Sequence, residues 1–448
     1  MSFHTFPASN PPTGTAVLNL KDSDFFNDSD SIKQISEFDL QRPPSCIQFV
    51  PDTRYENYLV VGTYQLEPDE VSVELTDTGS KESSPAFGEL GPKKQFRNGS
   101  LSLLKYGNGQ LSIVDTIECS SAVYDLHFLP GETTTFATSS STGTISFYHV
   151  VNSLRVSAGI GNISETRIQP LWSAQVLSPT TIITFFQFIP AQLNKFGPLI
   201  AATANDGGVY LMSYCLENFT IDLLNDGMPI TEHRLKFLGT PDYAWCCASY
   251  FKQTFSVYSG GDGGDLVRER IPFSDGKLQL DQRLAQIHNF HNAGVTAILP
   301  LPISTNDNSA LLLTGSYDEY VRLYFVKEKK VLAKLKLGGG VYRLKFVRQF
   351  HWPSGKASYT VLACCMHAGT KIIQVQGNPF GEWTIDVVAS LNVPGNNADN
   401  YCYAADVQPQ GQMQVIPSNR TYTRLCVSGT FVDKKLAVWE FMIRMSED

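Results

Sequence analysis

The sequence predicts an all-β fold, a seven-bladed β-propeller, and three observations support this prediction. Short apolar runs followed by Gly, Ser or Asp turns recur seven times along the 448 residues. Aromatic residues make up 11% of the chain, and the many Thr, Ser, Val and Tyr residues between them are typical of strands. The sequence shows no convincing helical periodicity. Seven units of three or four strands therefore predict blades that stack around a common axis.

The clearest of these units is "LLLTGSYDEYVRLYFV" (311–326), which reads as a strand, a turn and a second strand. Six weaker relatives follow the same pattern at intervals of 50 to 77 residues. Compact WD repeats have a period of about 40–45 residues, so the units must contain loop insertions. A shorter apolar run precedes each unit and predicts the innermost strand of a WD40-type blade. These runs are "SCIQFV" (45–50), "AVYDLHFL" (122–129), "TFFQFI" (184–189), "YAWCCASYF" (243–251), "AGVTAILPL" (293–301), "GVYRLKF" (340–346) and "YCYAADV" (401–407).

The propeller is predicted to span residues 15–442. Too little chain follows the last unit to supply the fourth strand of its blade, so the N-terminal run "TAVLNL" (15–20) is predicted to supply it and to close the ring. Residues 1–14 are predicted to be a disordered tail, and residues 443–448 a C-terminal tail. The stretch 67–100 is polar and rich in Pro, Gly and Ser, which predicts a surface loop inserted in the first blade.

Composition argues against several classes of protein. Hydrophobic residues make up 42% of the chain and charged residues 17%, which is typical of a globular protein with a sizeable core. The net charge of -8 argues against a nucleic-acid binder and suits a cationic ligand or a basic partner. Nine cysteines without a C-x-x-C pair argue against a disulfide framework or a zinc site. The sequence shows no signal-peptide pattern and no apolar run long enough for a bilayer, so we expect a cytoplasmic protein that is not inserted in a membrane. We also expect a monomer without a cofactor.

The geometry of a WD blade predicts which residues share a face. The segment that leads into the inner strand and the turn after the second strand lie on the same side of the ring, here called the top face. This arrangement gathers the unusual residues of blades 4 to 6 on one sector. The lead-in segments are 241–245, 291–295 and 337–342, and the turns lie at Asp262, Asp318 and His367.

Asp318 and His291 occupy the positions of the Asp and His that hydrogen-bond inside an ordinary WD blade. Thr314 or Ser316 would supply the hydroxyl group of this network, and Tyr324 stands where a Trp is usual. These positions favour a structural role for Asp318. Because it also lies on the top face, Asp318 is kept among the catalytic candidates.

Three further residues on this sector carry charges or can take up a proton. Glu319 stands in a turn that usually takes a small or neutral polar residue. His367 follows an apolar strand and is either a satisfied structural residue or a general base that works near pH 7. Arg343 either grips a carboxylate through its forked donors or bridges two blades.

A glycine run and three aromatic residues complete the candidate site. The run lacks the Lys-Ser/Thr pair and the helix of a phosphate loop, so it either allows a tight turn into blade 6 or offers N–H groups to a developing negative charge. The run consists of Gly338, Gly339 and Gly340. Trp245, Tyr317 and Tyr342 either pack between blades or hold a cation against their ring faces.

Five segments together resemble the WD-repeat diphthine methyl esterases of diphthamide biosynthesis. The similarity runs from about Phe38 to Phe441, although the family commonly has Trp where this chain has Tyr342, and the insertion 67–100 is the chain's own. The segments are "VGTYQL" (61–66), "HNAGVTAI" (291–298), "LLTGSYDEYVRLY" (312–324), "LGGGVYRLKF" (337–346) and "ACCMHAGTKI" (363–372).

The resemblance implies a carboxylic ester hydrolase that acts on translation elongation factor 2. Its substrate would be the methyl ester on a modified histidine of that factor, and its products diphthine and methanol. The alternative is a non-catalytic WD-repeat scaffold that docks other proteins, because a propeller fold does not determine function.

Our mechanistic hypothesis for the hydrolase is direct attack by water. His367 would be the base, or Glu319 if its pKa is raised, and the backbone of 338–340 together with Arg343 would stabilise the oxyanion. Ser316 and Cys365 stay open as nucleophiles of a covalent route. The trimethylammonium group of the substrate would be held by Trp245, Tyr317 and Tyr342.

Overall fold

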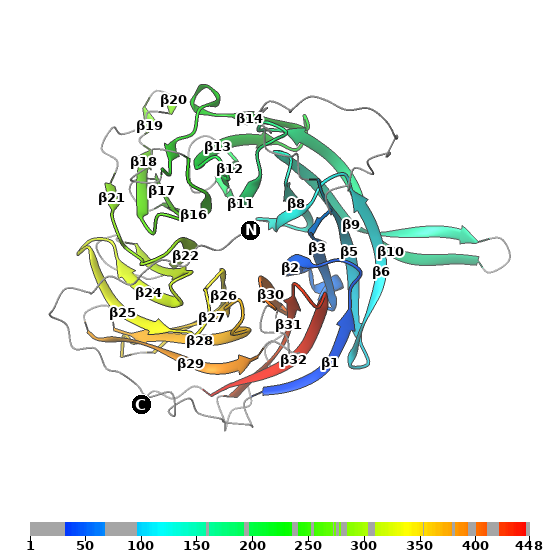
Figure 1. Cartoon of the computed structure of the whole chain (residues 1–448). Coiled ribbons are helices and arrows are strands. Elements are labelled where there is room, and N and C mark those ends of the chain that lie inside the picture. Colours follow the sequence, from blue (N-terminus) through cyan, green and yellow to red (C-terminus); the bar gives the residue numbers. More distant parts are fainter. Residues whose placement is uncertain are drawn as a thin grey trace, which may run out of the picture. The chain divides into compact units, whose positions relative to one another are not determined.

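The structure is a computed structural model, in which the strands form seven blades around a central axis (Figure 1). Each blade has a core of four antiparallel strands within the described part of the chain, which confirms the predicted seven-bladed propeller. The described residues are 32–67, 96–157, 161–191, 197–234, 241–251, 255–271, 273–274, 277–278, 285–302, 310–352, 354–378, 381–392, 400–409 and 421–444.

The blades follow one another along the chain, and each runs from an inner to an outer strand. Blade 1 contains β2 (Pro44–Phe49), β3 (Tyr58–Thr63), β5 (Arg97–Gly107) and β6 (Gln110–Cys119); blade 2 contains β7 (Val123–Leu129), β8 (Glu132–Ser140), β9 (Thr144–Ser157) and β10 (Gly161–Gln175); blade 3 contains β11 (Ile183–Ile189), β12 (Leu199–Ala204), β13 (Gly208–Cys215) and β14 (Thr220–Leu223). Blade 4 contains β16 (Ala244–Phe251), β17 (Phe255–Gly261), β18 (Leu266–Ile271) and β21 (Ala285–Ile287); blade 5 contains β22 (Val295–Leu301), β23 (Leu311–Ser316), β24 (Tyr320–Phe325) and β25 (Lys330–Lys336); blade 6 contains β26 (Arg343–His351), β27 (Ala357–Cys364), β28 (Thr370–Gly377) and β29 (Trp383–Leu391). Blade 7 contains β30 (Ala404–Val407), β31 (Thr421–Thr430), β32 (Lys435–Arg444) and β1 (Ile32–Asp39). The short strands β4 (Gln65–Leu66) and β15 (Thr231–Glu232) pair at the sides of blades 1 and 3, and β19 (Phe273–Ser274) pairs with β20 (Lys277–Leu278).

Every inner strand falls on a run that the sequence analysis singled out, so all seven of those predictions are confirmed. The end of the predicted insertion needs a correction. Residues 97–100 are the first residues of β5, because this strand begins earlier than the polar composition indicated. Gln65 pairs with Asn98 across the base of the insertion, and residues 68–95 lie outside the described residues.

An N-terminal strand closes the ring, as predicted. The strand that does so is β1, which pairs along β32 from Ile32 opposite Phe441 to Asp39 opposite Lys435. The predicted latch 15–20 and the predicted tail 1–14 lie outside the described residues. β32 itself continues to Arg444, slightly beyond the predicted start of the C-terminal tail at 443.

The apolar core lies between the blades rather than within them. Among the described residues there is one cluster of buried side chains for each pair of neighbouring blades, including the pair formed by blades 7 and 1. In that last cluster Phe49 and Leu59 of blade 1 pack with Val427 and Leu436 of blade 7. Because each blade needs both neighbours to bury its two faces, the ring has to close. None of the described residues belongs to a helix long and apolar enough to cross a membrane.

Candidate active site

Hydrogen bonds tie the lead-in segments to the turns of the same blade. In blade 4 the Asp262 N–H donates to the Tyr243 carbonyl at 3.1 Å, and in blade 5 the Tyr317 N–H donates to the Gly294 carbonyl at 3.0 Å. These bonds place the lead-ins and the turns of both blades on the top face, as the sequence analysis predicted.

A β-bulge near the start of the inner strand re-aims one side chain in each of blades 1 to 5. The residues at the register shifts are Ser45, Tyr124, Thr184, Trp245 and Thr296. Each Ser or Thr donates its hydroxyl to a carbonyl of the next blade, as Ser45 does to Val123 at 2.6 Å. At Tyr124 and Trp245 the ring packs against other rings instead.

Tyr342 and Tyr403 occupy the corresponding position in blades 6 and 7, shortly before β26 and β30. The ring centroid of Trp245 lies 6.1 Å from that of Tyr317 and 6.4 Å from that of Tyr342, which in turn lies 4.7 Å from that of Tyr403. These spacings are typical of favourable aromatic pairs. We call the connected set of partly exposed rings the aromatic arc; it consists of Tyr243, Trp245, Tyr317, Tyr342, Tyr401, Tyr403, Phe431, Tyr64 and Tyr124.

Two carboxyl groups, Asp242 and Asp262, border the arc at blade 4. The Trp245 indole N–H donates to Asp262 Oδ1, and the Gly263 N–H donates to Asp242 Oδ2 at 2.7 Å. The Asp242 side chain is buried, whereas Asp262 is exposed. Burial, and then the neighbouring charge of Asp262, raises the pKa of Asp242 to about 7. One carboxyl of the pair therefore holds a proton close to neutral pH.

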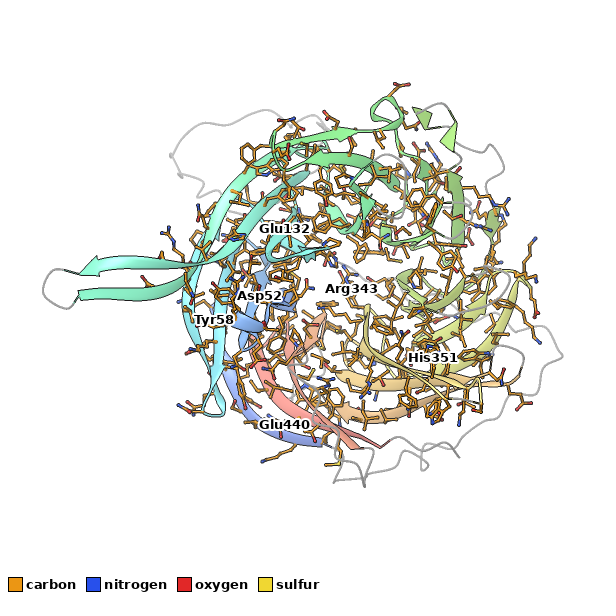
Figure 2. The ribbon with its side chains drawn as sticks, turned by 180° about the vertical axis from the view of Figure 1, so that it is seen from behind. Asp52, Tyr58, Glu132, Arg343, His351 and Glu440 are labelled. Carbon is orange, nitrogen blue, oxygen red and sulfur yellow. The ribbon has the colours of Figure 1, made fainter. Side chains whose placement is uncertain are left out.

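Arg343 lies near the centre of the ring (Figure 2). Its guanidinium group donates to the carbonyls of Thr184 and Tyr342, both at 3.2 Å, and lies 4.3 Å from the centroid of the Tyr342 ring. Because Thr184 belongs to blade 3 and Arg343 to blade 6, the side chain bridges blades across the centre, which is one of its two predicted roles. Stabilisation of an oxyanion by Arg343 stays a prediction.

The glycine run packs closely against the turn after β27. Gly338 has a φ of 82°. A Cβ atom on Gly339 would lie 2.1 Å from the Cys365 carbonyl oxygen, and one on Gly340 would lie 2.6 Å from Met366 Sδ. Close approach of the backbone is therefore sufficient reason for glycine at these positions. Donation of their N–H groups to an oxyanion stays a prediction.

The close approach at Gly339 makes a test of stability possible. Gly339→Ala is expected to lower the free energy of unfolding by about 2–4 kcal/mol, because the new methyl group meets a backbone oxygen that cannot rotate away. Gly107→Ala is the matched control, since a Cβ there has no heavy atom within 4 Å. Urea denaturation of both variants checks this, and equal midpoints would show that the run tolerates side chains.

The two predicted bases stand in turns of neighbouring blades, Glu319 in blade 5 and His367 in blade 6. Glu319 has a φ of 69°, and its carboxylate pairs with Lys336 Nζ at 3.2 Å. Lys336 ends β25, so this contact directs Glu319 towards the outer strand of blade 5. His367 is exposed in the turn between β27 and β28, beside Met366 with its φ of 45°. Both residues stay predicted bases.

Asp318 belongs to the hydrogen-bond network predicted for its blade. His291 Nδ1 lies 3.0 Å from both carboxylate oxygens of Asp318, and His291 Nε2 lies 2.9 Å from Thr314 Oγ1. Arg322 donates to the same carboxylate at 2.7 Å. Burial alone would raise the pKa of Asp318, but the hydrogen bond and charge of His291 and the Arg322 contact hold it well below its ordinary value. The network is confirmed with Thr314 as its hydroxyl, and a catalytic role for Asp318 stays a prediction.

The two candidate nucleophiles are fully buried. Ser316 Oγ donates to the Ala293 carbonyl at 3.1 Å and accepts from the Asp318 N–H at 3.0 Å. Burial raises the pKa of the Cys365 thiol well above its ordinary value, which disfavours the reactive thiolate. These environments favour direct attack by water over a covalent route.

Sequence reasoning missed Asp242 and most of the arc. An aromatic residue stands at the same place in the inner-strand runs of four blades, as Tyr124, Trp245, Tyr342 and Tyr403. Aligning these runs on their first apolar residue would have revealed this pattern. Nothing in the local sequence distinguishes Asp242, because its pairing with Asp262 depends on how the lead-in meets the turn.

Comparisons with known proteins bear on the predicted resemblance. No family model matches the chain. A human protein named diphthine methyltransferase is 33% identical over 167 residues, which cover 36% of this chain and 31% of the human protein. A fission yeast (Schizosaccharomyces pombe) protein of the same name is 24% identical over 390 residues, which cover 86% of this chain and 91% of that protein. The predicted resemblance is confirmed.

The diphthine methyltransferase homologues differ in how much of their length is matched. The mouse protein of that name is 32% identical over 169 residues, 36% of this chain and 30% of the mouse protein. The match therefore spans about three tenths of the human and mouse homologues, but nearly all of the fission yeast one.

Solved structures confirm the fold alone. A chain in the crystal structure of the mitotic checkpoint complex matches with a TM-score of 0.51 and 11% identity, covering 97% of this chain and 100% of that one. Chaetomium thermophilum Raptor matches with a TM-score of 0.50 and 10% identity, covering 93% of this chain and 30% of that one. At these identities the likeness carries no information on function.

Proposed function

We propose that this protein hydrolyses the methyl ester of methylated diphthine on translation elongation factor 2, with diphthine and methanol as products. The homologues named diphthine methyltransferase support a role in diphthamide biosynthesis. Ester hydrolysis is what the family resemblance implies. The observation that carries the proposal is an aromatic arc bordered by two carboxyl groups on the predicted face.

The arc suits the cationic part of this substrate. A trimethylammonium group has no N–H to donate, so a protein holds it with ring faces and with negative charge. Trp245, Tyr317 and Tyr342 supply three connected rings, and Asp262 lies beside them through its bond to the indole. Each ring that faces such a cation contributes about 0.5–2 kcal/mol.

The ester end of the substrate needs donors for the oxyanion and a base for the attacking water. The N–H groups of 338–340 and the guanidinium group of Arg343 are the proposed donors, because both lie next to rings of the arc. The formal charge of -8 favours association with a basic region of the elongation factor.

Methanol release from the methylated factor tests the proposal. The purified protein alone is expected to release methanol, and Trp245→Ala is expected to raise KM about tenfold or more with a smaller change in kcat. The matched control is Phe219→Ala, which removes an exposed ring of blade 3 outside the arc. Tetramethylammonium chloride is expected to compete with the substrate of the native protein, and more weakly in Trp245→Ala.

A different result would favour the scaffold function. If the purified protein released no methanol above the buffer control, and release began only when a second protein was added, the chain would dock an enzyme rather than act as one. Equal KM values for Trp245→Ala and Phe219→Ala would remove the arc from the substrate site.

A further inference from the structure

We infer that Asp262 is the general base of this hydrolysis and that Asp242 is a positioning residue that holds the neighbouring proton. The inference rests on the proposed function and assigns the step that the sequence analysis gave to His367 or Glu319. It stands on the position of the pair beside the arc, on the different exposure of its two members and on the connectivity of the substrate.

The connectivity of the substrate limits where the base can be. The trimethylammonium nitrogen and the ester carbonyl carbon are bonded to the same carbon atom, so a base for the attacking water has to lie beside the rings that hold the cation. Asp262 fulfils this condition because its Oδ1 accepts from the Trp245 indole. A Cβ atom on Gly294 would lie 3.1 Å from the Tyr317 ring and 3.2 Å from Asp262 Oδ1, so this glycine leaves room for both.

The other two candidates lie less favourably. The Glu319 carboxylate pairs with Lys336 on the outer strand of blade 5. His367 stands in the turn of blade 6, while Asp262 and Trp245 lie together on blade 4. A substrate whose cation contacts Trp245 therefore brings its ester next to Asp262.

The difference in exposure decides which aspartate is the base and which is the positioning residue. Asp262 is exposed and can contact a water molecule, whereas Asp242 is 4% exposed and accepts a hydrogen bond from the Gly263 N–H. Although Asp262 is exposed as a whole residue, neighbouring atoms shield its carboxyl group from water and raise its pKa, as burial does for Asp242. The indole bond and the bond to Asp242 work against this effect at Asp262. Asp262 therefore ionises first, and Asp242 keeps its proton until about pH 7.

Burial keeps two titratable groups beside the pair, His233 and Tyr317, uncharged near neutral pH. His233 lies under Gly261, and burial lowers its pKa to about 4, so its imidazole is neutral. Tyr317 faces Asp262 from blade 5, and burial raises the pKa of its phenol far above neutrality. Tyr243 follows Asp242 in the lead-in, and its carbonyl accepts from the Asp262 N–H. The Asp265 carboxylate belongs to the turn after β17 and bonds to His288 and Gln286.

The proposed step balances without a cofactor. The oxygen of a water molecule forms a bond to the ester carbonyl carbon, while its proton moves to the Asp262 carboxylate. The tetrahedral oxyanion then collapses, the bond from the acyl carbon to the methoxy oxygen breaks, and the proton moves from Asp262 to that oxygen. Methanol and the carboxylic acid of diphthine leave, and Asp262 is again a carboxylate.

The test compares Asp262→Asn, Asp262→Glu and Asp242→Asn with the native protein over pH 5 to 9, using the methylated elongation factor. Asp262→Asn is expected to lower kcat by about 10²- to 10⁴-fold, and Asp262→Glu to restore part of it. In the native protein the rate is expected to rise through about pH 7, because ionisation of Asp242 makes Asp262 a stronger base. In Asp242→Asn this rise is expected to disappear.

The outcomes separate this inference from the proposed function. If the native protein releases methanol and Asp262→Asn retains its kcat, the base assignment is wrong and the proposed function stands. A higher KM with an unchanged pH profile in Asp262→Asn would show that Asp262 only orients Trp245 and is not the base. If the native protein releases no methanol, both proposals fall. Should Asp262→Asn not fold, as judged by its melting curve, the pH profile of Asp242→Asn decides.

Discussion

Arg343→Met is expected to lower the free energy of unfolding by about 3–5 kcal/mol. The guanidinium group of Arg343 donates to carbonyls of blades 3 and 6, and methionine leaves these acceptors without that partner in the interior. Arg343 also supports the buried carboxylate of Asp125. Burial raises the pKa of Asp125, but the charges of His127 and Arg343 outweigh this effect and keep the group ionised. Urea denaturation at pH 7 measures the loss.

Arg54→Met provides the control for this change. Arg54 is an exposed arginine that also contacts a carboxylate, Asp52, and its replacement is expected to cost less than about 1 kcal/mol. Equal losses of unfolding free energy for the two variants would show that the central Arg343 stabilises the fold no more than an exposed arginine does. A stable Arg343→Met protein with a reduced kcat would instead support the oxyanion role alone.

Asp318→Asn is expected to lower the free energy of unfolding by about 2–4 kcal/mol at pH 7. The variant keeps the shape of the side chain but removes the charge that faces His291 and Arg322. The folded-state pKa of Asp318 is depressed, so its contribution is present above the unfolded value of about 3.9 and is lost as the pH falls below it. The difference between native protein and variant is therefore expected to shrink in acid.

Thermal unfolding between pH 3 and 7, together with methanol release, distinguishes the two roles of Asp318. A structural residue lowers stability and leaves the kcat of the folded fraction unchanged, whereas a catalytic residue lowers kcat in a stable protein. Asp39→Asn is the control, because that carboxylate is 84% exposed and its loss is expected to cost less than about 0.5 kcal/mol.

The sequence predicts the blades well because their pattern is local. Alternating apolar strands and small-residue turns repeat in every blade, and the His291–Asp318 network follows from spacing within one blade. The latch is different, since 15–20 and β1 (Ile32–Asp39) both lie before the first blade. The choice between them depends on the register with β32, which no local pattern encodes.

The candidate site is less accessible to sequence reasoning because it is assembled across blades. Trp245, Tyr317 and Tyr342 were found from their place on the top face, and the structure brings their rings together. The Asp242–Asp262 pair was missed, because one member comes from a lead-in and the other from a turn. Glu319 was chosen for its charge, but its partner Lys336 stands on another strand of the blade.

The pairing of β1 with β32 has a consequence for biosynthesis. A nascent chain exposes β1 before blades 1 to 6 are made, while its partner β32 is made only after them. Until β32 is made, β1 has an unpaired edge, and the apolar faces of blades 1 and 6 lack the neighbour that blade 7 provides. Chains that end before β32 therefore present apolar surfaces to chaperones and proteases, so stable folding has to wait for the synthesis of β32.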